Sequence, residues 1–145
     1  MALIPIPHQK VFMKSIEVVA GIIEDNHKIF ATQRGYGEFK GAWEFPGGKI
    51  EPGESREQAL ARELKEELSI DVSVGDYLCS VNHDYPNFHL LMHCFFCKII
   101  GGKPTLLEHE SAKWLGFQDF RSVEWLPADL SVIDILEKQF STSNR

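Results

Sequence analysis

Residues 48–70 read GKIEPGESREQALARELKEELSI and carry the clearest structural signal in the chain. Ser55 and Gln58 have the spacing of a capping box, which begins a helix. The apolar face of this helix is formed by leucines that recur every four residues, at Leu60, Leu64 and Leu68. The stretch therefore predicts an amphipathic helix over residues 55–68 that packs through its leucine face.

The same helix carries an acidic side. Glu63, Glu66 and Glu67 lie three and four residues apart, so their side chains project from one side of the helix. Like charges at this spacing repel by about 0.2–0.5 kcal/mol per exposed pair, and more where the dielectric falls. A divalent cation would neutralise them, since carboxylate oxygens are the ligands that Mg²⁺ and Mn²⁺ prefer. Taken alone, the cluster is more typical of a solvated helix face.

The residues that precede the helix favour a ligand site. In the stretch 45–50, FPGGKI, two glycines allow close approach of the backbone to a ligand. Lys49 adds a positive charge that suits phosphate. Arg62 is next to Glu63 and four residues before Glu66, where it is placed to hold a carboxylate.

The rest of the chain predicts a mixed sheet with helices packed on it. Residues 16–24 are almost continuously apolar, as in a buried strand, and a turn signal at 25–27 predicts a hairpin with residues 28–34. A glycine-rich loop over 35–41 leads to a short extended piece, 43–45, which Pro46-Gly47-Gly48 stops. The other expected elements are strands at 76–83, 88–100 and 112–116, a turn at 84–87, and a closing helix at 130–140.

Length and composition describe one globular domain, residues 1–145, of which 1–15 form a loosely held lead-in. With 43% hydrophobic and 25% charged residues, wholesale disorder is excluded. The net charge of −6 disfavours nucleic-acid polymers as partners. No apolar run reaches the ~18 residues of a membrane span, and no secretory signal is recognisable, so we expect a cytoplasmic protein without membrane association.

Cysteines and histidines are expected to be structural. Three cysteines do not make a disulfide framework. Cys94 and Cys97 lie three apart on a predicted strand and therefore point to opposite faces, as core residues rather than a metal or redox pair. The histidines lack metal-ligand spacing and are expected to be packed or surface residues: His83, His89, His93 and His109. Trp114 and Trp125 are expected to be packed.

The pattern Gly-x5-Glu-x7-Arg-Glu-aliphatic-x-Glu-Glu-x-Gly-aliphatic is the Nudix box, and through it the chain resembles the Nudix hydrolase family. The matching positions are Gly48, Glu54, Arg62, Glu63, Leu64, Glu66, Glu67 and Ile70. The similarity runs from residue 16 to 136, including WEFPGGK and WLPADL, and is greatest to the MutT-like branch and its bacterial CTP pyrophosphohydrolases. Ser69 replaces the box glycine that ends the helix in a left-handed conformation, which costs serine about 1–2 kcal/mol.

The resemblance implies an α/β/α sandwich with a mixed β-sheet between helices. It implies hydrolysis of nucleoside triphosphates to (d)NMP and pyrophosphate with Mg²⁺, or Mn²⁺, as cofactor. The implied metal ligands are Glu63, Glu66, Glu67 and the backbone carbonyl of Gly47. The implied catalytic and phosphate-binding residues are Arg62, Glu108 as general base, Arg34 and Lys49. Glu54 is expected to support Arg62, and Glu110 competes with Glu108, which lies six residues before Trp114.

Substrate selection is expected to involve Asp129, at the position from which MutT-type proteins read the nucleobase edge. An ionised Asp only accepts hydrogen bonds, which would favour an amino-bearing base such as cytosine; the alternative is an N-cap of the last helix. Phe45 and Phe88 are candidates to sandwich the base, although core packing is the commoner role of such aromatics. CTP, dCTP or modified pyrimidine dNTPs are the expected substrates, acted on by a monomer or homodimer. The alternatives are oxidised dGTP and a Nudix-fold sensor that binds a nucleotide without turnover.

Overall fold

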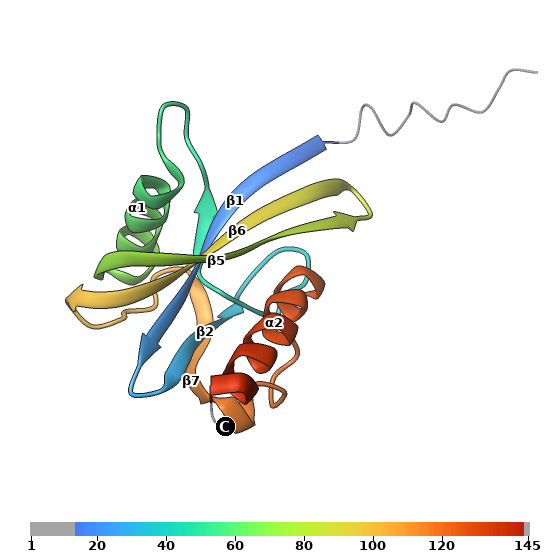
Figure 1. Cartoon of the computed structure of the whole chain (residues 1–145). Coiled ribbons are helices and arrows are strands. Elements are labelled where there is room, and N and C mark those ends of the chain that lie inside the picture. Colours follow the sequence, from blue (N-terminus) through green and yellow to red (C-terminus); the bar gives the residue numbers. More distant parts are fainter. Residues whose placement is uncertain (1–13, 144–145) are drawn as a thin grey trace, which may run out of the picture.

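Strand β1 (Lys14–Asp25) organises the sheet of the computed structural model, which describes residues 14–143 (Figure 1). It pairs in parallel with β6 (Phe88–Gly101) and antiparallel with both β2 (Lys28–Arg34) and β4 (Gly47–Lys49). The other strands are β3 (Trp43–Glu44), β5 (Asp71–Tyr85) and β7 (His109–Gly116). The strand order is β3-β2-β1-β6-β5, with β4 added to β1 and β7 added to β2. One parallel and several antiparallel pairs confirm a mixed sheet.

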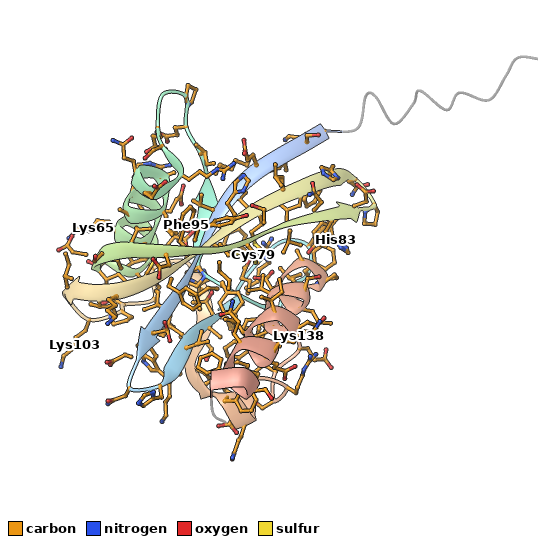
Figure 2. All side chains as sticks on the ribbon, in the orientation of Figure 1. Lys65, Cys79, His83, Phe95, Lys103 and Lys138 are labelled. Atoms are coloured by element: carbon orange, nitrogen blue, oxygen red, sulfur yellow. The ribbon has the colours of Figure 1, made fainter. Side chains whose placement is uncertain are left out.

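Helices α1 (Arg56–Leu68) and α2 (Pro127–Ser143) cover opposite sides of this sheet (Figure 1). Each covers its own core. Cys97 is buried in the core that holds the α1 leucines, whereas Cys94 is buried in the core that holds Ile133 and Leu136 of α2. Two residues labelled in Figure 2 mark the two sides: Phe95 belongs to the α1-side core, and Cys79 packs against the α2-side core. The α/β/α sandwich is confirmed, and so are the opposite faces of the two cysteines.

Helix α1 begins and ends with local signals. The Ser55 side chain accepts from the backbone N–H of Gln58, and the Gln58 side chain accepts from the Ser55 N–H, which completes the predicted capping box. After Leu68, Ser69 takes the left-handed conformation with φ 59° and ψ 36°. The helix therefore stops where a glycine would stop it, with a serine in that place.

Several element boundaries differ from the sequence predictions. Lys14 and Ser15 are part of β1 rather than of a lead-in, and the remainder of that lead-in lies outside the described residues. The strand expected at 76–83 extends over Asp71–Tyr85, because it pairs with the whole length of β6. Helix α2 starts at Pro127, three residues earlier than expected, since proline suits the first turn of a helix.

The short extended piece, β3, ends before Pro46, as expected, but Gly47 and Gly48 then form strand β4, which the sequence did not predict. A Cβ atom on Gly47 would lie 1.9 Å from the backbone oxygen of Val19. Only glycine therefore lets the chain approach β1 closely enough to pair.

Among residues 14–143, no helix is long and apolar enough to cross a membrane.

Candidate active site

Arg62 organises the acidic side of α1. Its Nε donates to Glu54 Oε2 at 2.7 Å, and its Nη2 donates to Glu54 Oε1 at 2.9 Å. The same Nη2 reaches the backbone oxygen of Lys49 at 3.0 Å, and Nη1 reaches Glu63 Oε1 at 2.9 Å. The expected support of Arg62 by Glu54 is confirmed. This guanidinium ties α1 to the loop that precedes it and to the backbone of β4.

Glu63 and Glu66 are placed differently on that side. The Glu63 side chain is only 16% exposed, and burial raises the pKa of its carboxyl against the opposing effect of Arg62. A Cβ atom on Gly48 would lie 2.4 Å from the Glu63 carboxylate, so glycine makes room for it. Glu66 is 58% exposed and lies 3.4 Å from Arg62 Nη1.

Glu67 lines a cavity of about 150 Å³, together with Arg34, Gly47, Glu108 and His109. Its side chain is 12% exposed, and its Oε2 is buried without a hydrogen-bond partner among the described residues. Burial, then the charges of Glu63, Glu108 and Glu44, raise the pKa of Glu67 to about 8, and a hydrogen bond from Gly47 opposes this shift. The carboxyl is thus costly to ionise in the absence of a cation.

The start of strand β7 also lines this cavity, through His109 and the preceding Glu108. The backbone N–H of Leu107 donates to the backbone carbonyl oxygen of Glu67 at 3.3 Å, which anchors this segment to the end of α1. Glu108 lines the cavity, and Glu110 is not among its lining residues. The position of Glu108 is compatible with the role predicted for it.

Arg34 and Lys49, the expected phosphate ligands, lie in different surroundings. Arg34 lines the Glu67 cavity and pairs with both carboxylate oxygens of Glu44, at 3.1 and 3.0 Å. Lys49 is exposed at the end of β4, and it does not line this cavity.

A second cavity, of about 200 Å³, shares Arg34, Glu44, Phe45 and Gly47 with the first. Phe88 and Asp129 line it, together with Phe39, Tyr85 and Met92. Phe45 is 4% exposed and stacks on Trp125 at 4.7 Å, while Phe88 stacks on Tyr85 at 5.0 Å. Both phenylalanines thus border the cavity, and Phe45 is at the same time a core residue.

Asp129 is not the N-cap of α2, which was one of its two expected roles. It is the third residue of the helix and is 3% exposed, and its Oδ1 accepts from the Phe45 N–H at 2.9 Å. Burial, followed by the charge of Glu44, raises the pKa of Asp129 to about 8. Burial therefore favours the neutral form of this carboxyl, which can donate as well as accept a hydrogen bond. The role of Asp129 in reading the nucleobase stays a prediction.

Comparison with known proteins identifies the fold family. The model of the NUDIX domain matches residues 14–134. The chain belongs to the Nudix hydrolase family. It is 38% identical to the CTP pyrophosphohydrolase of Escherichia coli K12 over 84% of this chain and 91% of that protein. It is 31% identical to the 8-oxo-dGTP diphosphatase of the same strain, over 87% and 99% of the two chains.

Solved structures give the same result. The solution structure of the E. coli ORF135 protein superposes with a TM-score of 0.77 at 34% identity, over 90% of this chain and 94% of that one. MutT from Aliivibrio salmonicida and Vibrio cholerae gives a TM-score of 0.71 at 34% identity, over 86% and 97%. The MutT-like resemblance seen in the box is therefore confirmed.

The Nudix box residues fit a divalent cation by their chemistry, although they do not form a closed ligand cluster. Among residues 14–143, no three carboxylate, imidazole or thiol side chains converge around one point; Glu66 lies on the exposed side, next to Arg62. The Oε2 atom of Glu67 is buried and has no partner among the described residues. Burial and the charges of neighbouring carboxylates raise the pKa of Glu67. A cation would relieve both. The set of Glu63, Glu66, Glu67 and the Gly47 carbonyl remains a prediction.

Sequence reasoning missed two residues of this site. Glu44 lines both cavities and pairs with Arg34. The sequence signal for Glu44 was a charged residue on a short strand between Trp43 and Phe45, which are both buried. His109 was expected to be an ordinary packed or surface residue. It is packed, but beside Glu67, a proximity that no spacing in the sequence encodes.

Proposed function

We propose that this Nudix hydrolase is a Mg²⁺-dependent nucleoside triphosphate pyrophosphohydrolase that releases (d)NMP and pyrophosphate. The observation that carries the proposal is the buried carboxyl of Glu67. It lines a cavity that shares four lining residues with a second, more apolar cavity. A triphosphate and a nucleoside would occupy these two cavities in turn.

The residues have separate roles in this proposal. Glu63, Glu66, Glu67 and the Gly47 carbonyl would hold Mg²⁺ or Mn²⁺, which polarises phosphoryl oxygens and lowers the pKa of water when bound. Glu108 accepts the proton of the water that attacks phosphorus. The bond between the α- and β-phosphates breaks as the new P–O bond forms, so that attack at the α-phosphorus expels pyrophosphate and attack at the β-phosphorus expels the nucleoside monophosphate. Arg62 fixes Glu63, while Arg34 and Lys49 contact the phosphates.

Selection of the base is proposed to involve Asp129, Phe45 and Phe88. A protonated Asp129 donates from its hydroxyl and accepts at its carbonyl oxygen, which suits the N3 and N4 edge of cytosine. The same carboxyl also suits uracil, so Asp129 alone does not select amino-bearing bases at neutral pH. CTP, dCTP and modified pyrimidine dNTPs are proposed first, because the relative that is 38% identical is named CTP pyrophosphohydrolase.

Oxidised dGTP is the second candidate substrate. It is favoured by the relative named 8-oxo-dGTP diphosphatase, which the alignment covers over 99% of its length. We further propose that the protein acts in the cytoplasm on free nucleotides, as a monomer or homodimer, and not on nucleic-acid polymers. Gel filtration with light scattering measures that oligomeric state.

A substrate panel tests the proposal. CTP, dCTP, 5-methyl-dCTP, UTP, 8-oxo-dGTP and ADP-ribose are incubated with Mg²⁺, and products are separated by chromatography. We expect pyrophosphate and monophosphate from at least one pyrimidine triphosphate. Glu67→Gln is expected to lower the rate about 10²–10⁴-fold, the size of effect typical for essential acid–base and metal groups. The matched control is Glu57→Gln, the same change at an exposed position in the first turn of α1.

The outcomes separate the candidate functions. Faster release from 8-oxo-dGTP than from every pyrimidine would replace the first substrate by the second. Nucleotide binding without release by the unmutated protein, over the whole panel, would favour a sensor. Equal rates for Glu67→Gln and Glu57→Gln would remove Glu67 from the reaction.

A further inference from the structure

Two buried polar atoms in the cavity have no hydrogen-bond partner among residues 14–143: Glu67 Oε2 and His109 Nδ1. The imidazole side chain of His109 is 9% exposed, and its Nε2 lies 3.7 Å from Glu67 Oε2. This separation is too long for a hydrogen bond. Leaving a buried polar atom without a partner is costly, and both of these atoms lack one among the described residues.

The backbone holds these two side chains next to each other. His109 is the first residue of β7 and pairs with Arg34 of β2 where the register shifts. The backbone N–H of Thr105 donates to the backbone carbonyl oxygen of Leu68 at 2.8 Å. Two residues later, the backbone N–H of Leu107 donates to the backbone carbonyl oxygen of Glu67. The loop is thus attached to the end of α1. An approach of about 0.7 Å by either side chain would bring Nε2 and Oε2 to an ordinary hydrogen-bond distance.

The surroundings of His109 determine which ring nitrogen carries the proton. A neutral imidazole has one N–H and one lone pair. No acceptor lies near Nδ1, whereas a carboxyl oxygen faces Nε2. With Glu67 ionised, as it would be when it holds a cation, its Oε2 only accepts, so the proton belongs on Nε2.

We propose that His109 is a positioning residue for Glu67. Its Nε2–H would donate to Glu67 Oε2 and so fix the orientation in which the carboxylate would hold the cation. Ligating carboxylates in proteins are commonly oriented by such outer hydrogen bonds, and their loss weakens metal binding about 10–100-fold. The inference rests on the proposed function in one respect, the assignment of Glu67 as a metal ligand.

Three substitutions test the proposal through Mn²⁺ binding, measured by electron paramagnetic resonance without nucleotide. His109→Gln keeps an N–H donor near the place of Nε2, His109→Asn keeps one only near the place of Nδ1, and His109→Leu keeps none. We expect His109→Gln to bind Mn²⁺ within about threefold of the unmutated protein, and the other two to bind at least about tenfold more weakly. Equal affinity in all three variants would overturn the inference and leave the metal assignment intact.

The tautomer provides a test that needs no substitution. Long-range ¹H–¹⁵N spectra of the unmutated protein with saturating Mg²⁺ are expected to show the His109 proton on Nε2. A proton on Nδ1 in the presence of Mg²⁺ would overturn the inference even if the variants did not fold. Absence of Mn²⁺ binding by the unmutated protein would overturn the proposed function together with the inference.

Discussion

Asp129 is a buried carboxyl whose pKa of about 8 makes the stability of the protein depend on pH. Between about pH 4 and pH 8 the unfolded chain releases this proton while the folded chain keeps it, so stability falls as pH rises. Asp129→Asn removes the titration and keeps an oxygen that accepts from Phe45. We predict that the variant melts close to the unmutated protein at pH 5 and at least about 3 °C above it at pH 8.5.

Thermal unfolding of both proteins over pH 5 to 8.5 measures this difference, in which the effects of all other titrating groups cancel. Asp129→Leu is the control, because it also loses the acceptor for the Phe45 N–H and should be less stable at every pH. A constant difference between Asp129→Asn and the unmutated protein would show that Asp129 is ionised in the folded state.

Helix α1 ends at a residue that carries strain. Ser69 has φ 59°, a conformation that costs a residue with a Cβ atom about 1 kcal/mol or more. Glycine would relieve this strain. It would also lower the free energy of unfolding by about 0.4–1 kcal/mol, because glycine gives the unfolded chain more conformational freedom. We predict that Ser69→Gly raises the melting temperature by about 2 °C without changing Mn²⁺ affinity, whereas Ser69→Ala gives no increase. A lower melting temperature for Ser69→Gly would mean that the serine is not strained.

Strand β4 carries two glycines with different neighbours. A Cβ atom on Gly47 meets the backbone of Val19, which cannot move without breaking the pairing with β1, whereas one on Gly48 meets the flexible carboxylate of Glu63. We predict that Gly47→Ala lowers the free energy of unfolding by more than about 2 kcal/mol. Gly48→Ala should change it by less than about 1 kcal/mol and weaken Mn²⁺ binding about tenfold by displacing Glu63.

Urea unfolding and Mn²⁺ titration of the two variants measure these effects. The unmutated protein is the reference for both. A large loss of stability in Gly48→Ala with unchanged Mn²⁺ affinity would show that Gly48 serves the fold rather than the site.

Elements with local signals were predictable from sequence, and those decided by tertiary contacts were not. The α1 helix has its capping box and leucine period within one stretch. Strand β4 has only Gly-Gly-Lys, and its pairing depends on space beside Val19 that no local pattern reports. For the same reason the box glutamates were found from their spacing, whereas the contact of His109 with Glu67 joins residues 42 positions apart (109 − 67).

The two cores share one sheet, so the molecule is expected to unfold as a unit. Strand β1 supplies Val19 to the core on the α1 side and Ile22 to the core on the α2 side. Loss of either core removes the support of the other. A ligand that binds only at α1 should therefore stabilise α2 as well.

Magnesium provides the measurement at this scale. A ligand of the folded state stabilises it by about 2.7 kcal/mol at a concentration of 100 Kd, so Mg²⁺ should raise the melting temperature by several degrees. We predict the same increase by far-UV circular dichroism and by fluorescence of the tryptophans, of which Trp125 lies in the α2-side core. Glu67→Gln should lose most of this increase and Glu57→Gln should keep it. An increase seen by only one of the two methods would show that the α1 and α2 sides unfold separately.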